Sequence, residues 1–375
     1  MKRLHRSFPG ALAPLLLLTP LLAFAQIGSK AAPPAPASPG VPAVSPGSAP
    51  PPGAKPAEVQ DVRVLEGKEE NDPYQLERLG VTFTQNGDLK KARELFEKAW
   101  KVGELPSAPF NIACLAARQG KVDAAFGQLD RAIAAGFDDE KMLLEDKDLD
   151  SIRSKPKFQN VLAAARKNAA AGDAAVVKEA TFVAPGGRVA AILVLLHDAS
   201  SDPLTVASPF LAQAREKGLF VAAPRGPSKA GKKRFGWGSP ERAAKGVAAA
   251  VLEARKRAGN LPVLAVGVGR GGMVAGFLAA TQPGLLAGAA SIVGPVDTCW
   301  LLSEAASSGM KQMHLFLGIS LGTSPQVLKA FRQGRDGLKA AGIQATYREW
   351  IGSESGLPAD VKGAVGEVLS ALTGQ

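Results

Sequence analysis

From residue 176 onward, short apolar runs of strand length alternate with longer stretches of helical periodicity. Six strands are predicted, at residues 190–196, 219–223, 262–266, 287–293, 314–317 and 344–350. Helical patterns lie at 204–217, 239–258, 271–281, 300–310, 325–341 and 358–372. Continuous apolar strands separated by helices predict a doubly wound, mostly parallel sheet covered on both faces. Ligands of such sheets bind at the carboxyl ends of the strands, so candidate site residues are sought there.

An internal repeat precedes this region, within residues 72–135. Four positions recur 33 residues later, namely Gly87, Ala92, Phe96 and Ala99 as Gly120, Ala125, Leu129 and Ala132. The spacing resembles the period of about 34 residues of tetratricopeptide repeats, which are helical hairpins. The second unit matches less well, because Ala113 stands where the first has Gly80. An unrelated pair of helical hairpins is the alternative.

The resemblance implies a concave surface that binds a protein partner. Two repeats bury little on their own, so a cap or a neighbouring domain is expected to cover their exposed face. We place this helical domain at residues 57–170 and the α/β domain at residues 171–375.

The first residues have the pattern of an export signal. Residues 1–25 combine a basic start, an apolar stretch and the small-x-small site Ala23-Phe24-Ala25. An uncleaved membrane anchor is the alternative, but Pro14 and Pro20 interrupt the apolar stretch. Residues 26–56 are rich in Ala and Pro and predict a disordered linker. The chain is therefore expected to be periplasmic or extracellular, with no membrane span after signal removal.

The formal net charge of +11 is concentrated in the C-terminal region, where residues 171–375 carry 22 basic and 14 acidic side chains. This surplus favours solubility or an anionic partner. Nucleic acid is not expected as a partner, because only 6% of the residues are aromatic and an exported chain rarely meets it. Cys114 and Cys299 fall in different predicted domains, so we expect Cys114 to be a buried apolar residue rather than part of a bridge.

Four local signatures in the C-terminal region occur in a definite order. They are Leu193 to His197, Val221 to Pro227 followed by Gly236-Trp237, Gly267 to Gly272, and Trp350 through Gly356-Leu357-Pro358. Together they resemble the phospholipase/carboxylesterase branch of the α/β-hydrolases over about residues 178–373. The resemblance implies an α/β-hydrolase-like fold with a Ser-His-acid triad at the strand ends.

The positions that should carry catalysis hold other residues. The family's G-x-S-x-G turn reads Gly267-Val268-Gly269-Arg270-Gly271, so Gly269 replaces the nucleophile. The same alignment puts Leu321 at the acid position and Ser355 at the histidine position. A phosphate-binding loop is the alternative for the glycine-rich turn, but its spacing does not match G-x-G-x-x-G.

Only three histidines occur in the chain: His5, His197 and His314. His197 follows a predicted strand at the correct edge, but in the loop that supplies oxyanion donors rather than the base. A remnant pocket is predicted around His197, Asp198, Arg225, Trp237 and Arg270. For His197 the alternative is a loop-anchoring side chain bonded to backbone.

Neither a metal nor a cofactor is expected, because His197, Asp198 and Asp202 are too few convergent ligands. A basic loop follows one predicted strand and would be either solvated or an anion site near Arg270. It contains Arg225, Lys229, Lys232, Lys233 and Arg234.

The sequence therefore predicts an exported, noncatalytic binding or scaffold protein. It would contact a protein partner through its repeats and a small or anionic ligand through the remnant pocket. The alternative is an active carboxylesterase or lysophospholipase-like hydrolase with Ser291 or Ser320 as nucleophile. A purely structural envelope protein is a third class, and fold alone does not decide among the three.

Overall fold

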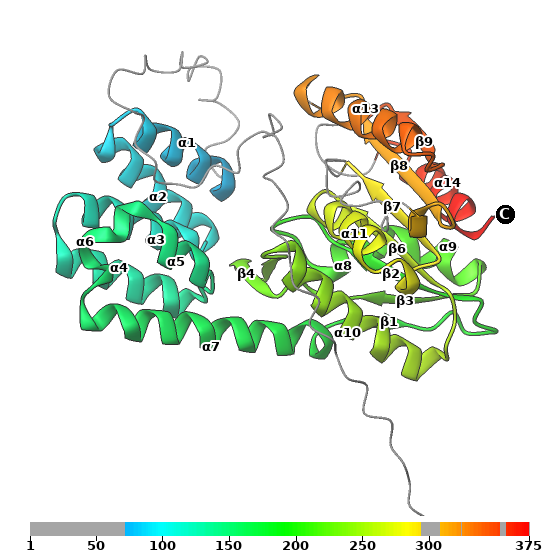
Figure 1. Cartoon of the computed structure of the whole chain (residues 1–375), viewed down its shortest axis with the longest axis horizontal. Coiled ribbons are helices and arrows are strands. Elements are labelled where there is room, and N and C mark those ends of the chain that lie inside the picture. Colours follow the sequence, from blue (N-terminus) through cyan, green and yellow to red (C-terminus); the bar gives the residue numbers. More distant parts are fainter. Residues whose placement is uncertain (1–71, 294–307, 324, 353–357, 375) are drawn as a thin grey trace, which may run out of the picture. The chain divides into compact units, whose positions relative to one another are not determined.

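A computed structural model describes residues 72–293, 308–323, 325–352 and 358–374 of the chain. The predicted signal at 1–25, the predicted linker at 26–56, Cys299 and Ser355 lie outside these ranges. Helices occupy the described chain up to residue 178, and an α/β region follows (Figure 1). The fold class predicted from the sequence, helices followed by a mostly parallel sheet, is confirmed.

Four helices form two successive hairpins. They are α1 (Pro73–Gln85), α2 (Leu89–Gly103), α3 (Ser107–Arg118) and α4 (Val122–Ala135). The carboxylates of Asp72 and Asp88 begin α1 and α2 by accepting backbone N–H bonds. The repeated apolar positions on α2 and α4 are at most 1% exposed, namely Ala92, Phe96, Ala99, Ala125, Leu129 and Ala132. The sequence repeat therefore marks equivalent core positions of the two hairpins.

A long helix joins the helical region to the α/β region. After α5 (Glu140–Glu145), η2 (Lys147–Leu149) and α6 (Asp150–Arg153), helix α7 runs from Pro156 to Lys178. Its first half packs on the helical hairpins through Phe158 and Leu162. Farther along, Val176 lies against Gly246 of α10 (Pro240–Ala258). The helix thus continues through residue 170, the predicted domain boundary.

The sheet has seven strands in the order β1-β3-β2-β6-β7-β8-β9. β1 pairs antiparallel with β3 at one edge, and all other pairs are parallel. The strands are β1 (Thr181–Val183), β2 (Ala191–Leu196), β3 (Leu219–Ala223), β6 (Val263–Val268), β7 (Gly288–Ile292), β8 (His314–Ser320) and β9 (Thr346–Trp350).

Helices cover both faces of this sheet (Figure 1). Side chains of α10, α11 (Arg270–Thr281) and α13 (Pro325–Ala340) share one apolar cluster with alternate strand residues. The other cluster joins the opposite strand faces to α8 (Pro203–Ala207), η3 (Ser208–Phe210), α9 (Leu211–Glu216) and α14 (Val361–Thr373). Burial on both faces explains why the central strands are continuously apolar. No helix in the described ranges is long and apolar enough to cross a membrane.

All six predicted strands are present, with ends shifted by a few residues. The helix predicted at 204–217 is divided into α8, η3 and α9 by the Ser208-Pro209 step. Most of the helix predicted at 300–310 lies outside the described residues. Three short strands were not predicted: β1 and the hairpin of β4 (Ser228–Gly231) and β5 (Arg234–Gly236).

The β4–β5 hairpin contacts the helical region. The Tyr74 hydroxyl donates a 2.9 Å hydrogen bond to the carbonyl of Ala230. The backbone N–H of Lys232 bonds to the Gly103 carbonyl at 3.1 Å, and its ammonium lies 3.8 Å from the Glu104 carboxylate. The predicted basic loop is therefore an ordered hairpin docked on α1 and the end of α2.

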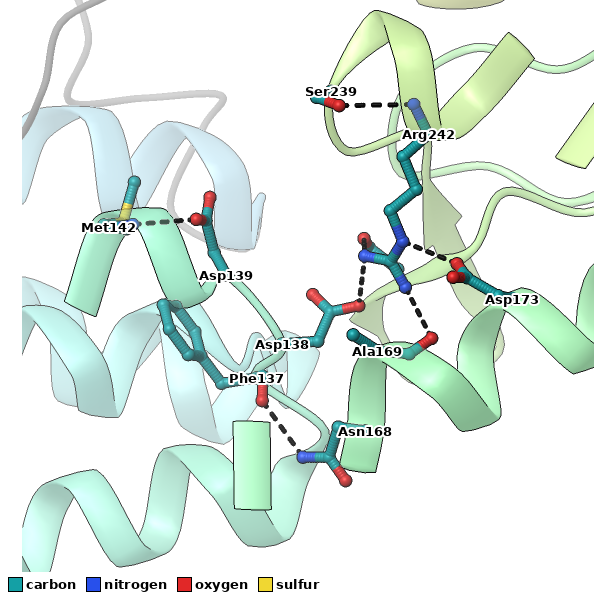
Figure 2. A network of polar contacts seen from close by, with 10 residues as sticks. Phe137, Asp138, Asp139, Met142, Asn168, Ala169, Asp173, Ser239 and Arg242 are labelled. Carbon is teal, nitrogen blue, oxygen red and sulfur yellow. Dashed lines mark hydrogen bonds and ion pairs between the residues drawn. The ribbon is translucent and has the colours of Figure 1, made fainter. Parts of the chain in front are cut away.

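Arg242 of α10 makes a second connection between the two regions (Figure 2). Its guanidinium donates to Asp138 at 2.8 Å and to Asp173 of α7 at 2.6 Å. It also reaches the Ala169 carbonyl at 2.8 Å and the Ser228 hydroxyl at 3.0 Å. One side chain thus ties the loop after α4, helix α7 and the start of β4 to α10.

Candidate functional site

The turn between β6 and α11 is the position of the predicted nucleophile elbow. Gly269 has φ 53° and ψ −120°, a backbone conformation that residues with a side chain rarely adopt. Its N–H bonds to the Ile292 carbonyl at 2.8 Å, which fixes the turn against β7. The backbone geometry of a strand-to-helix elbow is therefore present, at a glycine, which adopts it without the strain of a Cβ and supplies no functional group.

Asp198 lies directly against this turn. Its Oδ1 accepts the backbone N–H of Arg270 at 2.8 Å and that of Ala199 at 2.6 Å. A Cβ on Gly269 would lie 2.0 Å from the same oxygen. The carboxylate thus occupies the space that a side chain at position 269 would need.

His197 is fully buried and bonded to backbone at both ring nitrogens. Nε2 accepts the N–H of Gly226 at 2.9 Å, so Nδ1 carries the proton and donates to the Asp198 carbonyl at 2.6 Å. Burial lowers the pKa of His197 below its ordinary value. The neutral ring therefore anchors the loop and has no free nitrogen for proton transfer.

Trp237 is also buried and supports the same loop. Its indole Nε1–H donates to the His197 carbonyl at 2.8 Å. The indole stacks on the imidazole with 4.7 Å between ring centroids. These two members of the predicted pocket are therefore packed against each other inside the domain rather than lining an open surface.

The strand order places the two other predicted triad positions, Leu321 and Ser355, relative to Gly269. Leu321 follows β8 at the same sheet edge as Gly269, with β7 between them, and its side chain is exposed. Ser355 lies outside the described residues. His314 begins β8 and so lies at the opposite edge.

The two alternative nucleophiles are buried. Ser291 lies within β7, and its hydroxyl has no hydrogen-bond partner among the described residues. Ser320 ends β8, and its Oγ accepts the N–H of Gly322 at 3.2 Å. Within the described part of the chain, neither hydroxyl bonds to His197, since both ring nitrogens are taken by backbone groups.

The basic side chains predicted as an anion site are dispersed over several contacts. Arg225 lies 3.4 Å from the carboxylate of Glu179 and stacks over the Phe235 ring. Arg234 donates to the Ser200 carbonyl at 3.0 Å. Arg270 is exposed and uses its backbone, not its guanidinium, to contact Asp198.

An open depression of about 410 Å³ lies beside Leu321 at this sheet edge. Leu328 and Pro325 contribute its apolar lining. Lys329 and Arg332 bring positive charge, and Asp336 brings one negative charge. Arg332 is engaged in a two-point ion pair with Glu349 of β9. The depression lies along α13, apart from the pocket predicted around His197, Asp198, Arg225, Trp237 and Arg270, which stays a prediction.

Acyl transfer at such an edge needs a nucleophile, a base and free oxyanion donors. In the described residues, Gly269 supplies no hydroxyl, the ring of His197 is bonded to backbone, and the N–H of Arg270 is bonded to Asp198. The sequence analysis did not predict that Asp198 would accept the N–H of Arg270. The sequence features that could have suggested it are an Asp directly after His197 and a glycine at position 269.

The helical region holds a separate polar cluster. The ligand atoms of Cys114, Asp146 and Asp148 lie within 4.8 Å of one another. Burial raises the pKa of the Cys114 thiol well above its usual range and that of Asp148 to about 6. Cys114 is a free, buried cysteine.

Known proteins resemble parts of this chain, although no protein-family model matches it. Esterase PE8 is 18% identical with a TM-score of 0.43, covering 51% of this chain and 98% of its own. A carboxyl esterase from Bacillus coagulans is 12% identical with a TM-score of 0.41, covering 52% and 94%. An uncharacterized protein from Bacillus cereus is 13% identical with a TM-score of 0.43, covering 80% and 98%.

A curated protein is similar in sequence over a shorter stretch. This chloroplastic protein of Arabidopsis thaliana is 30% identical over 112 residues, which is 28% of this chain and 33% of that protein. The chain therefore spans about a third of the length of this curated relative.

Proposed function

We propose that this protein is a noncatalytic binding or scaffold protein whose α/β region keeps the hydrolase-like turn without its chemistry. The observation that carries the proposal is Gly269. It holds the elbow geometry at φ 53° and ψ −120° but has no side chain to attack a carbonyl. The chain has three histidines, and the one at this edge is buried with both nitrogens bonded.

The helical region is the proposed protein-binding part, as a tetratricopeptide-like module. Two hairpins with equivalent core positions support this proposal. The depression beside Leu321 is the proposed place for a small or anionic ligand, because it joins apolar lining to Lys329. Residues 1–25 have the pattern of an export signal, so we propose that the protein acts in the periplasm or outside the cell.

Turnover of short-chain nitrophenyl esters by the purified protein tests the proposal. We expect rates at the buffer background for the wild type and for Ser291→Ala and Ser320→Ala alike. Loss of a triad forfeits roughly a million-fold in rate, so any true activity would stand well above that background. Hydrolysis by the wild type that either serine variant abolishes would contradict the proposal and identify the nucleophile.

A further inference from the structure

We infer that Asp198 is an internal anion that occupies the oxyanion-type donors of this domain and closes them to carboxylates and oxyanions from solution. The inference deepens the proposed function and rests on it, since an acyl-transfer enzyme needs these donors free. It assigns the Asp198 side chain the role of filling this anion site, in addition to any effect on stability.

Two backbone donors converge on one oxygen of Asp198. The N–H of Ala199 comes from the loop after β2. The N–H of Arg270, which lies 72 residues after Asp198, begins α11. In α/β-hydrolases the oxyanion hole is built from an N–H in this loop and the N–H after the nucleophile. The carboxylate therefore sits where a tetrahedral intermediate would place its charge.

Electrostatics favour this placement of the carboxylate. α11 is a helix of 12 residues, and its N-terminal end carries partial positive charge. Bonds from backbone N–H groups to an ionised carboxylate are among the stronger hydrogen bonds. An external anion would have to displace a ligand that is tethered in position.

The neighbouring loop is held in place by the β4–β5 hairpin. Ser200 N–H bonds to the Phe235 carbonyl at 3.0 Å, and Phe235 N–H bonds to the Ser201 carbonyl at 2.9 Å. Trp237 bonds to the His197 carbonyl at 2.8 Å. Residues on both sides of Asp198 are thus fixed, which limits the distance that its carboxylate can move.

Gly269 and Asp198 depend on each other. A Cβ at position 269 would lie 2.0 Å from Asp198 Oδ1 and 2.2 Å from its Cγ. A side chain at 269 therefore expels the carboxylate from its donors. A change of Gly269 to serine would restore a hydroxyl and break this contact at the same time.

A double-mutant cycle measures that dependence. We expect Gly269→Ala to lower the thermal midpoint by at least about 5 °C, through backbone strain and loss of the Asp198 contact. In an Asp198→Ala background, the same change should cost much less, because only the strain remains. Additive midpoint shifts would overturn the inference, since contacting residues must couple.

Formate rescue provides a second measurement, independent of any change at Gly269. Formate supplies the carboxylate that Asp198→Ala removes, so it should raise the midpoint of that variant by a few degrees relative to sodium chloride at equal ionic strength. The wild type, with its donors filled, should show no such rise. Asp202→Ala is the matched control, because Asp202 also accepts two backbone N–H bonds, at the start of the short helix α8.

The formate and ester-turnover measurements test the role of Asp198 and the noncatalytic function separately. Equal responses of Asp198→Ala, Asp202→Ala and wild type to formate would overturn the assignment of Asp198 while leaving the noncatalytic function standing. Ester turnover by the wild type would instead remove the proposed function, whatever formate does.

Discussion

His197 directly follows β2, at the sheet edge where the β6–α11 turn also lies, yet its contacts are those of a structural residue. The ring is buried, stacks on Trp237 and bonds to the backbone of Gly226 and Asp198. Only the neutral imidazole fits these contacts, because Nε2 must accept the hydrogen bond from the Gly226 N–H. The stability of this loop should therefore depend on pH.

His197→Phe tests that dependence. At pH 7.5 we expect a loss of about 1–2 kcal/mol, because two hydrogen bonds disappear while the stacking on Trp237 remains. Burial lowers the pKa of His197, so the wild type loses stability as pH falls below about 6.5, where the unfolded chain binds the proton first. The gap between the two proteins should narrow at pH 5 in urea titrations. His314→Phe, at the exposed start of β8, controls for the loss of an imidazole; a constant gap would argue against a neutral His197.

Single residues also mark how much of the site could be predicted from the sequence. Gly269 was predictable, because a turn motif is local and a missing side chain is visible in the sequence. The contact of Asp198 with Arg270 was not, because it joins positions 72 residues apart and depends on one side-chain conformation. The burial of Trp237 likewise follows from the β4–β5 hairpin, which was not predicted.

Secondary-structure elements, too, were predictable where the signal is local and not predictable where it depends on distant contacts. The central strands were predictable because burial on both faces requires apolar runs. β1 is a half-buried strand of three residues, and β4 reads Ser-Lys-Ala-Gly, so neither carries a periodic signal. The hairpin is instead stabilised by contacts with α1 and α2, which are distant in sequence.

Helix α7 packs closely against the turn before β4, and Gly172 permits this approach. A Cβ on Gly172 would lie 2.0 Å from the Pro227 carbonyl oxygen. We expect Gly172→Ala to destabilise the protein by about 1–2 kcal/mol, because overpacking outweighs the gain in helix propensity. Gly127→Ala in α4 is the matched control. Among the described residues, no atom outside the local backbone of α4 lies within 4 Å of a Cβ added at Gly127, so this change should stabilise by about 0.5–1 kcal/mol. Chemical denaturation of both variants measures the change in the free energy of unfolding. Equal changes for Gly172→Ala and Gly127→Ala would refute the close packing of α7.

The helical and α/β regions share α7, the docked hairpin and the ion pairs of Arg242. Asp138 is nearly buried, and burial raises the pKa of its carboxyl while Arg242 lowers it. The hairpin that contacts α1 also holds the loop of Asp198. The α/β region therefore contacts the helical region in the described structure, and the need of the two hairpins for a covering neighbour stays a prediction.

Arg242→Ala should cost roughly 3 kcal/mol at pH 7, because it leaves the Asp138 carboxylate buried without its cation. The deficit should shrink toward pH 5, since an unpaired buried carboxyl takes up a proton more readily than in the unfolded chain. Arg332→Ala removes an exposed ion pair with Glu349 and should cost at most about 1 kcal/mol. Unfolding titrations at both pH values would expose an error if the two variants lost the same stability.

We propose that the α/β region has the elbow geometry at Gly269 without a reactive nucleophile. Intact-mass spectrometry after incubation with a fluorophosphonate probe tests it most directly, because the probe bonds covalently to activated serines and does not depend on guessing a substrate. We expect an unchanged mass for the wild type under conditions in which an active serine hydrolase is fully labelled. A stoichiometric mass increase on any serine of this chain would contradict it.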